Sequence, residues 1–180
     1  MKITETHLQD CFILENDKYE DERGFFTETY NKKALEEALG KSVEFVQDNL
    51  SKSYYGVVRG LHYQKKSPQG KLVRVTKGAA FDVAVDIRKG SRTFGKWFGL
   101  ELSENNNLQL WIPEGFAHGF VAMSDEVFFE YKCTNFYMPS DEGSIYWKDT
   151  TLAIDWPDIK GIKISKKDAE AEYFENSDLK

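Results

Sequence analysis

The chain is poor in residues that several large classes of protein depend on. Its 180 residues include only two cysteines, Cys11 and Cys133, which cannot form the disulfide framework of a small secreted domain. No stretch approaches 18 apolar residues, and no apolar signal segment stands at the amino end. A membrane span is therefore not expected, and the sequence predicts a protein of the reducing cytoplasm.

Basic residues are in the minority. Lysine and arginine number 24 against 30 aspartates and glutamates, which gives a net charge of -6 and a pI near 5.2. A nucleic-acid-binding domain carries the opposite balance, so nucleic acid is not expected as a partner. Three of the five arginines, Arg23, Arg59 and Arg74, lie in glycine-punctuated parts of the first half, which leaves room for a local anion site.

Histidines are few and widely separated. The chain has three, His7, His62 and His118, and none belongs to the His-x-His pair that often binds a metal in jelly-roll barrels. The sequence also lacks a Gly-x-Ser-x-Gly elbow, a Walker loop and a dinucleotide-binding fingerprint. A catalytic metal, a serine hydrolase, an NTPase and a Rossmann dehydrogenase are therefore not expected.

Aromatic residues, by contrast, are abundant and lie in short runs. Phe, Tyr and Trp make up 14% of the chain, in segments bounded by Gly, Asn, Asp and Ser, a pattern typical of β-strands. The sequence holds nine to twelve such strands, with turn signals every 8 to 12 residues, one helix at 31–39 and another opening at 165–168. It predicts an all-β, antiparallel jelly-roll barrel or sandwich with short peripheral helices, in a single domain over residues 1–180.

The segment 79–87 has the cleanest alternation in the chain. Large apolar residues occupy one face and Ala80, Asp82, Ala84 and Asp86 the other, as expected of a strand packed on both sides. Further strands are expected at 43–49, 93–102, 108–112, 127–132, 144–147 and 154–156, with a loop at 51–56.

The stretch 59–74 carries the clearest chemistry. It places His62, Lys71 and two arginines, Arg59 and Arg74, around a Pro-Gln-Gly turn between two expected strands. Histidine moves protons near neutral pH, and a nearby lysine can hold an oxyanion, so we expect proton transfer at a carbon beside a carbonyl. A hairpin with a solvated basic edge is the structural alternative.

Other polar residues have structural explanations of comparable weight. Glu28 shares a strand face with Phe26 and would need a partner such as Arg23 if buried, or it is exposed on an edge strand. Asn49 ends a strand with amide groups that suit sugar hydroxyls or a pyrimidine edge, or it forms a turn. Tyr131 lies on an apolar face, where a hydrogen-bonded core role is common.

Asp168, in the helix expected near the carboxyl end, also has both a functional and a structural explanation. Ser165 and Asp168 have the spacing of a capping box, which would give the aspartate a purely structural role.

Eight blocks of this sequence, in order from about residue 3 to residue 170, resemble one enzyme family, the dTDP-4-dehydrorhamnose 3,5-epimerases. They are Arg23-Gly-Phe-Phe-x-Glu28, Phe45-Val-Gln47-Asp-Asn49, Gly56-Val-Val-Arg59-Gly-Leu-His62-Tyr-Gln, Gln69-Gly-Lys71-Leu-Val-Arg, Asp82-Val-Ala-Val-Asp86-Ile-Arg, Ile112-Pro-Glu-Gly-Phe-Ala-His118-Gly-Phe, Tyr131-Lys and Ser165-x-Lys167-Asp168. One such block is weak, but eight in the right order are specific.

The resemblance implies a cupin-type jelly roll, usually a homodimer, that epimerises dTDP-4-dehydro-6-deoxy-D-glucose at C3 and C5 without metal or nicotinamide. It implies that His62 is the base, oriented and charge-balanced by Asp168. Lys71 matches the lysine that stabilises the enolate at the C4 oxygen, and Tyr131 matches the acid on the opposite face. By the same resemblance, the substrate is bound by Arg23 and Arg59 at the diphosphate, by Tyr137 stacked on thymine, and by Glu28, Gln47, Asn49, His118, Glu142 and Lys167.

One conflict and three rivals remain at this point. Arg59 and His62 fall on opposite faces of a regular strand, which requires either a bulge or a role for Arg59 across a dimer partner. The nearest rival function is a single-centre epimerase or ketoisomerase acting on a related dTDP-keto sugar. A sugar-nucleotide binding module without chemistry and a metal-dependent cupin enzyme are the other two.

Overall fold

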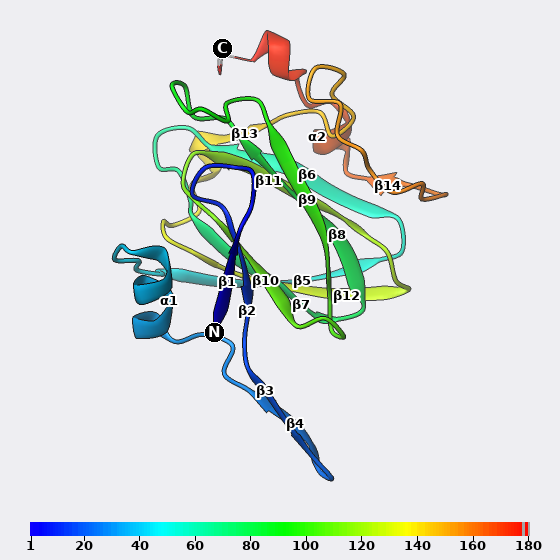
Figure 1. The fold of residues 1–180 in the computed structure, drawn as a ribbon. Coiled ribbons are helices and arrows are strands. Elements are labelled where there is room, and N and C mark those ends of the chain that lie inside the picture. The colour runs from blue at the N-terminus through cyan, green and yellow to red at the C-terminus, as the bar shows by residue number, and fades with distance from the viewer. Residues whose placement is uncertain (178, 180) are drawn as a thin grey trace.

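The fold is a sandwich of two antiparallel sheets in the computed structural model, which describes residues 1–177 and 179 (Figure 1). The first sheet has the order β1 (Lys2–Glu5), β2 (Phe12–Glu15), β10 (Leu108–Ile112), β7 (Lys71–Lys77), β12 (Glu126–Cys133) and β5 (Gln47–Tyr54). The second has the order β13 (Glu142–Ser144), β6 (Val57–Gln64), β11 (Phe116–Ala122), β8 (Ala79–Asp86) and β9 (Trp97–Ser103), and β14 (Lys163–Ile164) pairs with β6 in parallel.

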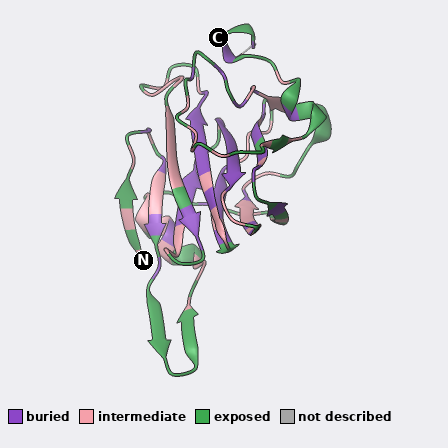
Figure 2. Cartoon of the chain, turned by 90° about the vertical axis from the view of Figure 1, so that its right-hand side faces the viewer, coloured by how far each residue is buried: buried purple, intermediate pink, exposed green. Residues whose placement is uncertain are grey.

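The main core lies between the two sheets, where the buried strands of Figure 2 face each other. Val73, Leu110 and Phe129 from the first sheet pack with Ala84 and Phe120 from the second, and the Phe120 and Phe129 rings stack at 4.2 Å. These inward-facing positions are apolar, as the core of a sandwich requires. The prediction of an all-β antiparallel fold is confirmed.

Strand β8 is packed on both faces, as its alternation predicts. Ala80 and Ala84 belong to the core between the sheets, whereas Val83, Val85 and Ile87 join a second cluster on the outer side. That outer cluster is covered by the chain after residue 145, which returns over the second sheet.

The helices are short and peripheral. Helix α1 (Lys32–Leu39) is capped at its start by Asn31, whose side-chain oxygen accepts a hydrogen bond from the Ala34 amide. It ends at Gly40, which has φ 65°. Helix α2 (Lys166–Ala169) and two 3₁₀ turns, η1 (Pro139–Asp141) and η2 (Phe174–Asn176), lie in the C-terminal part. Both helices occur where the sequence predicts them.

Several predicted strand limits are wrong. β5 begins only at Gln47 and continues to Tyr54, so the loop expected at 51–56 is mostly strand. β9 begins at Trp97 because Ser91 and Thr93 turn back to bond the Asp86 carboxylate. No strand forms at 154–156, where Trp156 packs on Trp147 and Phe81 instead.

Strands β3 (Lys18–Asp21) and β4 (Gly24–Thr27) form a hairpin that projects from the end of the sandwich opposite α2 and β13 (Figure 1). Its aromatic side chains are solvent-exposed in this chain: Tyr19 at 64%, Phe25 at 59% and Phe26 at 68%. A large exposed apolar surface of this kind commonly marks an interaction site.

Candidate active site

A cavity of about 360 Å³ lies between the sheets, bounded by β5, β7 and β12 on one side and by β6 and β11 on the other. Nine of the predicted site residues line it: Gln47, Asn49, Arg59, His62, Lys71, His118, Tyr131, Tyr137 and Glu142. The structural alternative for the stretch 59–74, a hairpin with a solvated basic edge, therefore does not hold for His62 and Lys71.

Arg59 and His62 reach the same cavity because strand β6 is irregular. Its pairing with β11 shifts register between His118 and Phe120, directly opposite this segment. Gly60 has φ 118° and lies against the β11 backbone, where a side chain would clash. The bulge changes the face on which the following side chains emerge, which resolves the conflict in the sequence pattern within one chain.

His62 is bonded to a carboxylate that lies 106 residues away in the sequence. Its Nε2 lies 2.6 Å from Asp168 Oδ1, while the histidine side chain keeps 32% of its surface exposed. An ionised carboxylate can only accept, so Nε2 carries the proton in the neutral ring and Nδ1 keeps a free electron pair. The arrangement produces a base with a fixed tautomer.

Asp168 is positioned by the first turn of α2. The Ser165 hydroxyl accepts a hydrogen bond from the Asp168 backbone amide, as the cap of the helix, and a hydrogen bond from Ser165 also helps to lower the pKa of the Asp168 carboxyl. The Asp168 carboxylate also accepts hydrogen bonds from His62 and from the Gly60 amide, so its role goes beyond the cap. Burial alone raises the pKa of Asp168, but these hydrogen bonds and the imidazole outweigh it and lower the pKa below its ordinary value.

Lys71 begins β7 with its side chain enclosed in the cavity. The residue is 8% exposed, and its ammonium makes no hydrogen bond or ion pair with the described residues. Burial lowers the pKa of Lys71, and the nearby Cys133, Asp82 and Glu142 act in the opposite direction. A buried ammonium without a bonded partner is costly, which is typical of a group reserved for a ligand.

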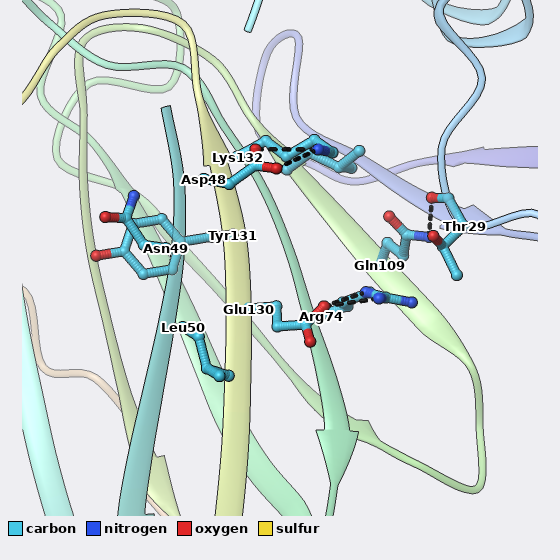
Figure 3. A pocket seen from close by; sticks show the side chains of 10 residues that line it. Thr29, Asp48, Asn49, Leu50, Arg74, Gln109, Glu130, Tyr131 and Lys132 are labelled. Atoms are coloured by element: carbon cyan, nitrogen blue, oxygen red, sulfur yellow. Dashed lines mark hydrogen bonds and ion pairs between the residues drawn. The ribbon is translucent and has the colours of Figure 1, made fainter. Parts of the chain in front are cut away.

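Tyr131 points into the cavity because of the alternation of β12. Figure 3 shows Tyr131 and Asn49 on one side of strands β12 and β5, with Glu130 and Lys132 on the other. Burial raises the pKa of the Tyr131 phenol. The phenol therefore stays protonated at neutral pH and is available as an acid.

The opposite side of the same sheet has a groove of about 380 Å³ (Figure 3). Its charges are neutralised in pairs: Arg74 Nη2 lies 2.6 Å from Glu130 Oε2, and Lys132 lies 2.9 Å from Asp48. Arg74, one of the three arginines considered for a local anion site, therefore forms an ion pair with Glu130 on the outer face of the sheet.

The rim of the cavity is formed by the segment after β12. The Tyr137 hydroxyl donates to Glu142 Oε2 at 2.9 Å, and Lys167 forms an ion pair with the same carboxylate. Burial alone raises the pKa of Glu142, but the bonds from Lys167 and Tyr137 lower it overall. Gln47 accepts the Tyr137 amide at 2.9 Å, so β5 and the rim are tied together.

Arg23, Glu28 and Arg59 are predicted binding residues that are solvent-exposed. Arg59 lines the cavity but is exposed, and it donates to Ser53 and to the Lys52 carbonyl. Arg23 pairs with Asp21 in the hairpin, and Glu28 is exposed just after β4. Within one chain, Arg23 and Glu28 do not reach the cavity, and Arg23 does not partner Glu28.

Comparison with known protein families identifies relatives of this chain. The family model for dTDP-4-dehydrorhamnose 3,5-epimerase matches residues 5–176. The chain belongs to this family. A curated relative with that name from Shigella flexneri is 53% identical over 179 residues, which cover 99% of this chain and 98% of the relative.

Solved epimerase structures agree with this assignment. An epimerase from Legionella pneumophila Philadelphia 1, in complex with dTDP-4-keto-L-rhamnose, superposes with a TM-score of 0.96 at 51% identity and covers 98% of this chain and 94% of its own. A 3'-monoepimerase from Streptomyces bikiniensis, in complex with dTDP-quinovose, superposes at 0.88 with 29% identity and covers 93% and 85%.

The sequence analysis did not assign a site role to several residues that line the epimerase cavity, namely Ser51, Gln69, Gly119, Phe120 and Cys133, nor to Asp82 beside it. Cys133 lies on the same face of β12 as Tyr131, and its thiol accepts from Asn49 at 3.6 Å; the period of two along β12 could have identified it. Asp82 contacts His118 inside the barrel, where its neighbours Ala80 and Ala84 indicated only tight packing.

The described part of the epimerase chain contains no helix long and apolar enough to cross a membrane. The same residues include no group of three or more His, Cys, Asp and Glu side chains placed to hold a metal.

Proposed function

We propose that this protein epimerises dTDP-4-dehydro-6-deoxy-D-glucose at C3 and C5 to dTDP-4-dehydro-L-rhamnose, a step of dTDP-rhamnose biosynthesis. The observation that carries the proposal is the His62–Asp168 pair at 2.6 Å, in a cavity shared with Lys71 and Tyr131. Membership of the family and relatives of that name over almost the full length support the same reaction.

We assign the base to His62. Its Nδ1 abstracts the proton from the ring carbon next to the C4 ketone, and the imidazolium that forms is balanced by Asp168. The carboxylate also fixes the tautomer, so no rearrangement of the ring is needed before abstraction.

Lys71 completes the abstraction. A C–H beside a ketone is too weak an acid for imidazole unless the C4 oxygen is stabilised as an enolate. The buried ammonium of Lys71 has no protein partner among the described residues, so it can donate to that oxygen without first breaking an ion pair.

Tyr131 returns the proton on the opposite face. It enters the cavity from the first sheet, while His62 enters from the second, so the two groups approach from different walls. Epimerisation requires this separation because a proton returned by the base on its own side would regenerate the substrate.

The remaining predicted residues are assigned to binding. Gln47, Asn49, His118 and Glu142 line the cavity and would bond the sugar and nucleotide, with Lys167 acting beside Glu142. The exposed ring of Tyr137, at 49%, would provide the stacking surface for thymine. Arg59 at the mouth would hold the diphosphate with Arg23.

A homodimer would account for the position of Arg23 and Glu28. The β3–β4 hairpin holds exposed Phe25 and Phe26 away from its own barrel, which suits packing against a second copy. We therefore propose that Arg23 and Glu28 complete the cavity of the partner subunit.

We also propose that residues 1–180 act as one domain in the cytoplasm without a metal or organic cofactor. One core between the two sheets joins elements from both halves of the chain, and the two cysteines are free and buried. The polar residues assigned above supply a base, an acid and an oxyanion donor, so the proton transfers need no additional group.

Exchange in deuterated water tests the double epimerisation. The wild-type protein is expected to introduce deuterium at both C3 and C5 of the dTDP-4-keto sugar, read by NMR. Label at one carbon only would favour the single-centre epimerase, the activity named for the Streptomyces bikiniensis relative. Binding without any exchange would favour the non-catalytic module, and formation of a 3-keto sugar would favour the ketoisomerase.

Tyr131→Phe should separate abstraction from reprotonation. Without the phenol, we expect epimerised product to fall on the order of 10²-fold or more, while deuterium still enters from the side of His62. The measurement compares product formation with C–H exchange for the same sample. The control is Phe129→Leu, a core change on the same strand face. It should lower thermal stability but leave the ratio of product formation to C–H exchange unchanged. Equal loss of exchange and product in Tyr131→Phe would contradict the assigned role.

The dimer predicts a shared active site. Light scattering at micromolar concentration should give twice the chain mass of 20.8 kDa. Arg23→Ala alone should lower affinity for dTDP while His62→Ala alone removes turnover, and mixing the two variants should restore some sites with both groups intact. A monomeric protein with full activity would rule out this arrangement.

A further inference from the structure

A second histidine–carboxylate pair lies in the barrel beside the catalytic one. His118 Nε2 is 2.7 Å from Asp82 Oδ1, and the residues are 7% and 0% exposed. His118 is opposite His62 in the pairing of β11 with β6, so the two imidazoles are neighbours on the same cavity wall.

The two imidazoles differ in their surroundings. The side chain of His62 keeps 32% of its surface exposed, whereas that of His118 keeps 9% and lies against the Phe129 ring at 5.9 Å. Burial lowers the pKa of His118, and the positive charges of Lys71 and His62 act in the same direction, against the effect of Asp82. His118 is therefore neutral at physiological pH.

Asp82 does not have the partners of a structural carboxylate. Its Oδ2 is buried without a hydrogen-bond partner among the described residues. Asp86, four residues further along the same face of β8, instead bonds Arg88, Ser91 and Thr93 and fixes a loop. An incompletely bonded buried carboxylate is costly, so its presence calls for an explanation, and the bond to His118 offers one.

We propose that Asp82 is a positioning residue that holds His118 in the tautomer protonated on Nε2, so that Nδ1 accepts a hydrogen bond from a sugar hydroxyl of the substrate. This inference rests on the proposed function and deepens it. Asp82 itself does not contact the sugar.

The fixed neutral tautomer has a chemical reason. His62 becomes positively charged when it takes the ring proton, and Lys71 is already an ammonium in the same cavity. A third cation at His118 would oppose that proton transfer. A neutral acceptor binds a hydroxyl equally well before and during abstraction, so its effect falls on KM and leaves kcat unchanged.

The tautomer can be read directly in the free protein. With three histidines in the chain, ¹⁵N-labelled histidine gives few signals, which single His variants assign. The wild type at neutral pH is expected to show His118 protonated at Nε2 and unprotonated at Nδ1. If His118 carries its proton on Nδ1, or a proton on both nitrogens, the proposal is wrong. This result is independent of whether the protein shows epimerase activity.

Kinetics then test the coupling. In Asp82→Asn the amide can donate to Nε2 and reverse the tautomer, as a carboxamide does in other His–Asp pairs. We expect KM for the dTDP-keto sugar to rise roughly three- to tenfold, the range for one net hydrogen bond, with kcat nearly unchanged and dTDP affinity unaltered. In a His118→Phe background, Asp82→Asn should change KM no further.

Asp86→Asn is the matched control. It should lower thermal stability without changing the His118 signals or KM, because its partners are all in the adjoining loop. The inference would be overturned if Asp82→Asn and His118→Phe had additive effects on KM. It would also be overturned if Asp82→Asn reversed the His118 tautomer and left KM unchanged. A protein with the expected tautomer but no turnover would instead reject the proposed function.

Discussion

Replacing His62 with asparagine is expected to lower kcat on the order of 10³- to 10⁴-fold and to abolish deuterium exchange at both carbons. The amide is close in size to imidazole but cannot take a proton at neutral pH. Since one base serves both carbons in this proposal, exchange at C3 and at C5 should fall together. NMR exchange and product assays on the same samples measure both effects.

The His62→Asn protein should still fold and bind dTDP. His62 is only half-buried, and its loss leaves Asp168 with the Gly60 amide as a remaining donor. His7→Asn is the matched control, because His7 is exposed and its polar contact is with the carbonyl of Trp97, which is not one of the assigned site residues. Normal exchange at one carbon in His62→Asn would show that a second base exists, and the single-base mechanism would fail.

Local patterns in the sequence predicted the faces of strands well. The alternation along 127–132 placed Tyr131 on the same side as Phe129, and the structure confirms that both point between the sheets. The Asn31 and Gly40 signals located α1 because capping depends on adjacent residues only. These features are decided by chemistry within a few residues of the chain.

Contacts between distant segments could not be derived in the same way. Asp168 had a complete local explanation as a capping residue, and only the fold brings it to His62. Asp82 was interpreted as a residue in a tightly packed strand face, because nothing nearby in the sequence indicates the histidine 36 positions later. The family resemblance supplied the Asp168 pairing but not the Asp82 one.

The bulge in β6 is an intermediate case. The sequence required either an irregular strand or a partner subunit to bring Arg59 and His62 to one site, but it could not choose between them. The register shift opposite His118 provides the irregular strand. For Arg23 and Glu28 no such local device exists, since the hairpin that carries them projects away from its own barrel.

Lys71→Met is expected to lower kcat by about 10²- to 10³-fold, the usual effect of removing one oxyanion donor. Unlike Tyr131→Phe, it should suppress exchange as strongly as product formation, because the enolate must be stabilised before any proton leaves. Methionine fills a similar volume without a charge, and a buried charge is costly, so thermal stability should be unchanged or higher.

The pH profile gives an independent test of the same group. Lys71 acts as an ammonium, and burial lowers its pKa, so kcat should fall on the alkaline side below the pH at which an ordinary lysine near 10.4 titrates. Lys71→Arg should move that alkaline limb to higher pH if the variant retains activity. Lys132→Met is the matched control, since Lys132 faces the outer groove and pairs with Asp48. If Lys71→Met kept kcat within tenfold of the wild type, another group would have to stabilise the enolate.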